Sequence, residues 1–260
     1  MQATINLKLE LLEAVYKFYD EYAKKYFSVC MPGCCKCCTT SILVTTLECF
    51  YIICYLKSQG KENLLERFNG LSEKNYLRPT ITTNERAYKC LNRIMPQEGE
   101  EEHWVSSCPF LHKSKCLIYE VRPFGCRSFF SEVKCEISLQ AVIRPKLLTV
   151  NILFLQFIEH IDIKGLFGNM IDILLFLSSN KKFKHYEQSE EFSPSKTLLP
   201  TRPIPGFLIP PSHGQEINNV LNSLYNTKIN DTDFKTKLLE LKQAFTKDLT
   251  DASSYVMLHL

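Results

Sequence analysis

The segment Cys30-Met-Pro-Gly-Cys34-Cys35-Lys-Cys37-Cys38 places five cysteines within nine residues, and the interpretation of the whole chain starts from it. Two residues separate Cys34 from Cys37, which is the usual spacing of a chelating pair for zinc or for an iron–sulfur cluster. The proline and glycine that follow Cys30 allow the backbone to turn back towards that pair. Cys38 follows Cys37 directly, and adjacent side chains diverge. These two thiols can therefore serve different atoms or different centres.

A second group of cysteines begins seventy residues after Cys38, at Cys108. Proline follows Cys108 directly and fixes the backbone beside a ligand, as in several iron–sulfur sites. Cys116, Cys126 and Cys135 come at wider spacings, so their thiols can meet only through tertiary folding. We expect the two groups to lie close together in space and to share a metal centre.

The other four cysteines are set aside as ligands. Cys49 and Cys54 lie five residues apart in an expected helix and therefore face different sides of it. Cys90 is alone in a polar stretch, and Cys35 is the additional thiol of the first cluster. The predicted metal ligands are Cys30, Cys34, Cys37, Cys38, Cys108, Cys116, Cys126 and Cys135. Eight thiols suit two four-thiolate sites, or one site with spare or resolving thiols; the pattern assigns no catalytic residue.

Two arginines flank Cys126 in the second group. Four thiolates around Zn²⁺ or around a [4Fe–4S]²⁺ core carry a net charge of about −2. We expect Arg122 and Arg127 to offset this charge or to donate hydrogen bonds to sulfur. Ordinary pairing at the surface is the alternative role for both side chains.

Composition and charge restrict the class of protein. The chain has 260 residues, 45% of them hydrophobic and 23% charged, which is ordinary for a globular protein. Its net charge of +3 is too small to indicate nucleic-acid binding. The first ten residues lack the pattern of a secretory signal, and no apolar stretch suits a transmembrane helix. We therefore expect a cytoplasmic protein, in which clustered thiols favour metal over disulfides.

Apolar periodicity predicts a mainly α fold: a single helical unit built around the cysteine-rich site. Helices are expected over 5–27, from Thr45 to about 60, and over 146–160, 166–180, 215–226 and 232–249; the last has a stripe that ends at Leu249. Thr45 and Glu48 fit a capping box at one helix start. Residues 61–102 look helical and charged, with an acidic solvated loop over 96–102. The proline-rich stretch 193–212 is expected to be an extended arm that cannot form a central strand. We divide the chain into a cysteine-cluster metal-binding domain, 1–145, and a helical C-terminal region, 146–260, packed on it.

The cysteine motifs together resemble a known family. The pattern Cys30-x3-Cys34-x2-Cys37-Cys38, followed by Cys108-Pro-Phe-Leu, Cys116-x-Ile-Tyr, Arg122-Pro and Cys126-Arg, is similar to the YkgJ family of cysteine-cluster proteins. The resemblance covers roughly residues 27–136. This chain departs from the family pattern at Cys35, where the family usually has glycine, and at Thr39, where it often has arginine. The additional thiol leaves the ligand set of the first cluster open by one residue.

The resemblance implies a putative zinc- or iron-chelating domain that contains an iron–sulfur cluster, and it suggests three functions. The first is a binding module with a thiolate-held centre, 4Fe-4S or mononuclear iron or zinc, used for electron transfer, sensing or structure. The second follows from the flagellin lysine N-methylases of that family: a protein-lysine methyltransferase that uses S-adenosylmethionine. The third is a structural zinc protein. We expect a protein or redox partner, and neither nucleic acid nor a membrane.

Overall fold

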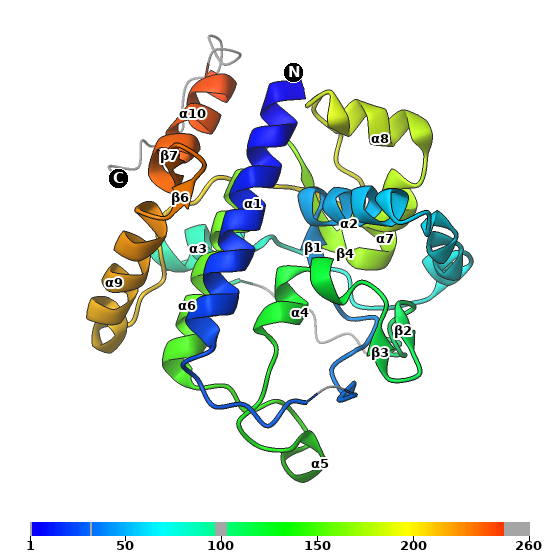
Figure 1. Cartoon of the computed structure of the whole chain (residues 1–260), viewed down its shortest axis with the longest axis horizontal. Coiled ribbons are helices and arrows are strands. Elements are labelled where there is room, and N and C mark those ends of the chain that lie inside the picture. The colour runs from blue at the N-terminus through cyan, green and yellow to red at the C-terminus, as the bar shows by residue number, and fades with distance from the viewer. Residues whose placement is uncertain (1, 32, 97–102, 247–260) are drawn as a thin grey trace.

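Helix α1 (Gln2–Ala23) lies at the centre of the molecule, with other helices on both sides of it (Figure 1). In this computed structural model the described residues are 2–31, 33–96 and 103–246. Helix α1 packs against α2 (Thr46–Ser58), α6 (Pro145–Ile161) and α10 (Phe234–Thr246). One hydrophobic core therefore contains side chains from both 1–145 and 146–260.

The other helices surround this centre or carry the cysteine segments. They are α3 (Thr83–Leu91), α4 (Phe124–Ser128), α5 (Cys135–Ser138), α7 (Met170–Leu177), α8 (Asn180–Glu187) and α9 (Gly214–Tyr225), with the 3-10 turns η1 (Glu62–Phe68), η2 (Leu71–Glu73), η3 (Tyr119–Val121) and η4 (Pro211–His213). The described chain is mainly helical, as predicted. Among the described residues, no helix combines the length and the apolar character needed to cross a bilayer.

The strands are short and form three small antiparallel sheets. One sheet has the order β1 (Leu43–Thr45), β4 (Leu166–Asn169) and β5 (Leu198–Pro200). The other two are the hairpins β2 (Leu111–His112) with β3 (Lys115–Cys116), and β6 (Lys228–Ile229) with β7 (Thr232–Asp233). The proline-rich arm thus supplies β5, an edge strand of the first sheet. This agrees with the expectation that the arm is extended and forms no central strand.

The apolar stripe predicted for the first helix is only part of its buried surface. Leu11 and Val15 are completely buried, whereas Phe18 and Tyr22 of the same stripe are partly buried. Tyr26 lies beyond the end of the helix. Because three helices pack around α1, a wider face is covered than one stripe provides, and it adds Ile5, Leu12, Tyr16 and Tyr19 to the core.

The helix predicted over 166–180 is wrong at its start, where residues 166–169 form strand β4. A Cβ atom on Gly168 would lie 2.7 Å from Leu198 Cδ2, so glycine allows β5 to approach β4 closely. Asn169 then caps α7 by accepting a hydrogen bond from the Ile171 N–H at 2.9 Å. One continuous apolar run is therefore divided into a strand and a helix by a close sheet contact and a cap.

One further expectation, for residues 61–96, needs correction. Two others concern residues outside the described ranges. Residues 61–96 are less helical than predicted, because η1 and η2 are 3-10 turns and only α3 is an α-helix. Residues 97–102 of the predicted acidic loop, and Leu249 of the last predicted stripe, lie outside the described residues. The helices predicted over 146–160 and 215–226 are confirmed as α6 and α9.

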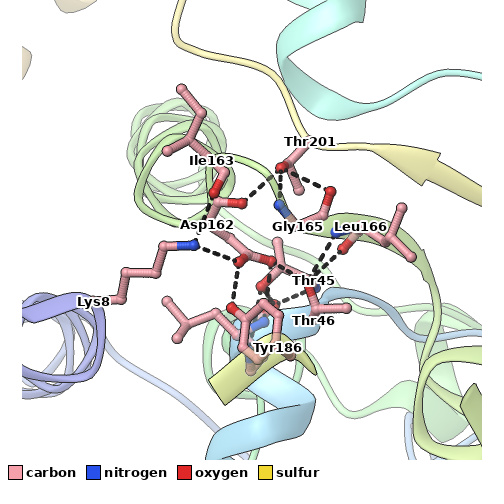
Figure 2. Close-up of polar contacts among 11 residues, drawn as sticks. Lys8, Thr45, Thr46, Asp162, Ile163, Gly165, Leu166, Tyr186 and Thr201 are labelled. Atoms are coloured by element: carbon pink, nitrogen blue, oxygen red, sulfur yellow. Dashed lines mark hydrogen bonds and ion pairs between the residues drawn. The ribbon is translucent and has the colours of Figure 1, made fainter. Parts of the chain in front are cut away.

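A buried carboxylate, Asp162, joins four helices at the end of α6 (Figure 2). Its oxygens accept hydrogen bonds from the Thr46 hydroxyl at 2.6 Å, from the Leu47 N–H at 3.1 Å and from the Tyr186 hydroxyl. The Lys8 ammonium of α1 lies 3.5 Å from Asp162 Oδ1 and donates to the Ile163 carbonyl at 2.8 Å. Burial lowers the pKa of Lys8 and raises that of Asp162.

The turn after Asp162 leaves no room for a side chain. A Cβ atom on Gly165 would lie 2.3 Å from Asp162 Oδ2. The Thr201 hydroxyl donates to the Asp162 carbonyl at 2.7 Å and accepts from the Gly165 N–H at 3.1 Å. Glycine is therefore required where the backbone passes this carboxylate, and the proline-rich arm is fixed to the same turn.

Two neighbouring residues of α6, the buried Glu159 and the partly buried His160, have opposite shifts of pKa. Glu159 accepts hydrogen bonds from the Asn84 N–H at 2.8 Å and from the Arg202 N–H at 2.9 Å, yet burial raises its pKa to about 7. His160 Nδ1 accepts from the Ile204 N–H at 3.2 Å, and burial lowers the pKa of the imidazole to about 4.

Replacing Lys8 should strongly destabilise the protein. In the Lys8→Met variant, Asp162 keeps its charge without the buried cation, and we expect the free energy of unfolding to fall by about 3 kcal/mol. Urea unfolding at neutral pH measures the change. The matched control is Lys17→Met, because Lys17 is exposed on the same helix. Equal stability of the two variants would show that the ion pair does not matter to the fold.

The pH dependence of stability should change in the Glu159→Gln variant. The folded pKa of Glu159 is about 7 against an ordinary 4.5, so its contribution is greatest at low pH and is lost as the pH rises through 7. His160 acts in the opposite direction, because its pKa of about 4 lies below the ordinary 6.5 and its contribution is lost as the pH falls. We expect the stability of the variant relative to wild type to rise by about 2 kcal/mol between about pH 5 and pH 8. Urea unfolding at each pH tests this, with exposed Glu66→Gln as the control. A constant difference would rule out titration of Glu159 in that range.

Candidate metal centre

The two cysteine groups are joined by their backbones. Thr39 and Ser107 form an antiparallel bridge, and the Cys108 N–H donates to the Cys38 carbonyl at 2.9 Å. The Thr40 N–H donates to the Ser106 carbonyl at the same distance. The expectation that the first and second groups meet in space is confirmed for their backbones.

A tight hairpin carries Cys116 back towards Cys108. The Leu111 N–H donates to the Cys108 carbonyl at 2.9 Å, and Leu111 pairs with Cys116 across β2 and β3. Lys113 and Ser114 at the turn have positive φ angles of 47° and 60°, as a two-residue hairpin turn requires. The nine-residue segment from Cys108 to Cys116 is thus folded back on itself, which the spacing alone does not reveal.

Glu48 fixes the helix that carries Cys126. Its carboxylate closes the predicted capping box with Thr45 at the start of α2. The other oxygen, Oε1, accepts from the Phe124 N–H at 2.7 Å and from the Tyr16 hydroxyl at 2.9 Å. Phe124 is the first residue of α4, so one buried side chain positions α4 against both α1 and α2. The predicted capping box is confirmed. The structure adds that the Glu48 carboxylate also positions α4.

Four thiols form an inner group around this helix: Cys38, Cys108, Cys116 and Cys126. Burial raises the pKa of Cys126, and the neighbouring thiols of Cys108, Cys116 and Cys37 raise it further. A hydrogen bond from Cys37 lowers the pKa of Cys38, against the opposing effects of burial and of the other three inner thiols. The members of the inner group therefore influence one another's ionisation.

An outer group consists of Cys30, Cys34, Cys37 and Cys135. The pKa of Cys34 is lowered by a backbone hydrogen bond from Lys36 and raised by burial and by the thiols of the other three members, with a net increase. The Ser131 N–H lies 3.4 Å from Cys30 Sγ and donates to it. Just upstream, the Val29 N–H donates to the Ser131 carbonyl at 2.9 Å, so the backbone attaches the first cluster to the segment leading to α5.

Cys37 of the outer group also influences the inner group. It raises the pKa of both Cys34 and Cys126, and its thiol donates to the Phe129 carbonyl at 4.0 Å. Within the described ranges, however, no three Cys, His, Asp or Glu side chains form a set that could hold a metal ion. The structure thus brings the two cysteine segments together at their backbones, but in the described ranges their sulfurs form no metal-binding set.

Four cysteines were excluded as metal ligands from the sequence. Three of them lie on helices α2 and α3, and the fourth is Cys35 of the first cluster. Cys49 is completely buried and Cys54 is half-buried, both on α2, and burial raises the pKa of each. Cys90 is exposed on α3, and Cys35 is partly exposed beside the outer group. All twelve cysteines are free thiols in this structure.

The two arginines have different roles. Arg127 donates to Asp20 at 2.6 Å and to the carbonyls of Arg122 and Glu120, so its guanidinium holds the fold together and points at backbone and carboxylate oxygens. For Arg127 the structure shows the alternative role, pairing with oxygen atoms, and an offset of thiolate charge stays a prediction. Arg122 lowers the pKa of Cys116, although burial raises it more, so this arginine is placed to offset thiolate charge.

Comparison with known proteins gives no further guide: no family model, no curated protein and no solved structure matches this chain. The resemblance to the YkgJ family therefore stays a prediction. The residues that sequence reasoning missed are Tyr16 and the Phe124 N–H, which meet Glu48. The only sequence signal was the capping box, which marks Glu48 as a helix-start residue and says nothing of its other partners.

Removing the Glu48 carboxylate should loosen the helix that carries Cys126. In Glu48→Ala, the Phe124 N–H and the Tyr16 hydroxyl lose a buried acceptor, and we expect a loss of about 3 kcal/mol of stability. Hydrogen exchange should accelerate first in residues 124–128. The control is Glu66→Ala at an exposed position. Unchanged protection of 124–128 relative to α6 would show that Glu48 does not position α4.

Proposed function

We propose that this chain is a metal-binding protein that holds one or two thiolate-ligated centres. The inner group and the outer group are the two ligand sets. An iron–sulfur cluster, of the 4Fe-4S type, is the first candidate for occupant, and mononuclear iron or zinc is the alternative. The observation that carries the proposal is the Thr39–Ser107 bridge, which joins the backbones beside Cys38 and Cys108, seventy residues apart in the sequence.

The donor set suits such a centre. The eight predicted ligands are free thiols, enough for two sets of four, the number that tetrahedral zinc or a 4Fe-4S cluster requires. Carboxylates are not part of the sets, since Glu48 is already occupied by hydrogen bonds from α1, α2 and α4. Thiolates without hard oxygen ligands favour zinc or iron–sulfur chemistry over magnesium or calcium.

The raised pKa values of these thiols have a consequence for binding. Burial raises the pKa of Cys108 to about 11, and burial with neighbouring thiols raises that of Cys126. A bound cation removes this penalty, because it stabilises the thiolate form. Binding therefore releases protons, and the apparent affinity for metal decreases as the pH falls. In the proposed complex, backbone N–H groups at Phe110, Leu111 and Ile118, together with Arg122, are the nearby groups that stabilise the thiolates.

The two groups differ in access to solvent. Cys30 and Cys34 of the outer group are exposed, whereas all members of the inner group are partly buried. A redox centre in the outer group is thus within reach of a protein partner. The inner group is placed to tie α4 and the β2–β3 hairpin to the first cluster, a task that zinc or an iron–sulfur cluster performs equally well.

Anaerobic purification with metal and sulfide analysis tests the proposal. We expect bound metal in the wild type and its loss in Cys38→Ser and Cys126→Ser for the inner group, and in Cys34→Ser for the outer group. Cys54→Ser and Cys90→Ser are matched controls and should keep full metal content. A brown protein that absorbs at about 400 nm and is bleached by dithionite identifies iron–sulfur, and a colourless protein with zinc identifies the structural alternative.

Two results would contradict the proposal. The first is a folded wild type that takes up neither iron with sulfide nor zinc under reducing conditions. The second is equal metal content in the Cys126→Ser and Cys90→Ser variants, because metal would then bind outside both thiol groups. Loss of metal from the inner-group variants alone would reduce the proposal to one centre.

A further inference from the structure

Helices α3 and α6 meet at one end and leave apolar side chains exposed away from that end. The Asn84 N–H, in the first turn of α3, donates to the Glu159 carboxylate at 2.8 Å. The Asn84 side chain also donates to the Gln156 carbonyl at 3.1 Å. The start of α3 therefore lies against the last turns of α6 and is joined to them by polar contacts.

The packing side of α3 is only partly covered. Asn84 and Ala87 are buried on this side, and Leu91 follows Ala87 by four positions, which is the spacing of one helix face. A Cβ atom on Gly206 would lie 2.9 Å from Leu91 Cδ1, and the Gly206 carbonyl accepts from the Gln156 side chain at 2.9 Å. The last turn of α3 therefore stays beside α6 and the proline-rich arm, although Leu91 itself is exposed.

The corresponding side of α6 is uncovered in the first half of the helix. Ile152 lies four positions before Gln156 and seven before Glu159, so the three residues share one side. Leu148 lies another four positions before Ile152. Both Leu148 and Ile152 are exposed, whereas most residues of α6 are buried. Helix α3 therefore covers only the second half of this side of α6.

The residues that follow α3 add to the exposed apolar surface. Arg93 has a left-handed φ of 59°, and the Ile94 N–H donates back to the Lys89 carbonyl at 2.8 Å. This is the Schellman arrangement, in which the residue after the left-handed one lies against the last turn of the helix. Ile94 and Met95 therefore extend the surface at the end of α3. We call the whole set the α3–α6 face: Tyr88, Leu91, Ile94, Met95, Leu148 and Ile152.

The area of the α3–α6 face matches what a stable dimer needs. The exposed fractions of its six residues, in chain order, are 53, 46, 49, 85, 48 and 36%, equal to about three complete residues. At roughly 150–200 Å² for a large residue, the face exposes on the order of 500 Å² of mainly apolar surface. A standard interface buries about 800 Å² on each partner, and roughly 450 Å² of that is apolar. An exposed apolar patch of this size marks an interaction site.

The chemistry of the face suits a second copy of the same chain. A two-fold interface places residues near the axis against their own equivalents, so a charged residue there would meet a like charge. None of the six residues is charged, and Leu148 and Ile152 form an aliphatic ridge with a spacing of four. Ridges of this spacing pack against each other in the commonest class of helix–helix contact. At the border, Glu85 already pairs within the chain, with Lys89 at 3.3 Å and Arg202 at 3.4 Å.

We propose that the α3–α6 face is the interface of a homodimer with two-fold symmetry. The α6 helices of the two copies cross along Leu148 and Ile152, and Tyr88, Leu91 and Ile94 of each copy cover the ends of this ridge. None of the eight predicted metal ligands belongs to the face. This inference therefore goes beyond the proposed metal binding and does not depend on it.

Sedimentation velocity of the whole purified chain under reducing conditions tests the proposal. We expect a species with twice the 30.2 kDa mass of one chain at a protein concentration of about 10 μM. The double variant Leu148→Ser with Ile152→Ser should weaken the dimer at least about tenfold, because each copy loses two buried aliphatic side chains. Ile137→Ser is the matched control and should dimerise as the wild type does, because Ile137 is exposed on α5, outside the face.

Charge variants provide an independent measurement if the double variant fails to fold. Tyr88→Lys with Met95→Lys adds like charges to both sides of the interface, and should weaken the dimer most at low salt. Leu239→Lys is the control, because Leu239 is exposed on α10, outside the face. Wild-type protein that sediments as a single chain at about 100 μM overturns the proposal and assigns the face to a different protein. Dimers of the face variants that are as stable as those of the wild type also overturn it, because the two copies then meet through another surface.

Discussion

The first turn of α2 is the constraint on which the rest of the structure depends. Its Thr46 hydroxyl and Leu47 N–H bind the buried Asp162 carboxylate, which also meets Lys8 of α1 and Tyr186 of α8. A carboxylate in a dry interior is tolerated only where several donors surround it, so these elements must arrive together. The short sheet and the proline-rich arm are fixed around the same point.

The same turn also organises the thiol groups. Glu48 lies one position after Leu47, and it directs its carboxylate away from Asp162, towards Tyr16 and the start of α4. One end of a single helix therefore supports both the polar centre of the core and the helix that carries Cys126. The thiols themselves contribute little to this scaffold, since the Thr39–Ser107 bridge and Glu48 hold their backbones.

Features that depend on residues close together in the sequence were largely predictable. Contacts between residues far apart in the sequence were not. Apolar periodicity located α1, α2, α6 and α9, and Thr45 with Glu48 marked a helix start, because these patterns depend on residues a few positions apart. Nothing local shows that Lys8 will meet Asp162, 154 residues away, or that Glu48 will meet Phe124, 76 residues away. Strand β4 was not predicted, because its formation depends on the close approach of β5, where Leu198 lies next to Gly168. The contact between the two cysteine segments was expected from their motifs, but the backbone bridge that forms it depends on tertiary structure.

The position of Asp162 has a consequence for the order of events in folding. Its partners come from the first helix and from Tyr186 and Thr201, so the polar centre is complete only when most of the chain is available. Contacts this far apart in sequence make folding slow and leave early chains with unpaired strands and charges. During synthesis from the N-terminus, α1 and α2 therefore emerge before α8 and β5. Until those elements follow, the polar centre around Asp162 is incomplete.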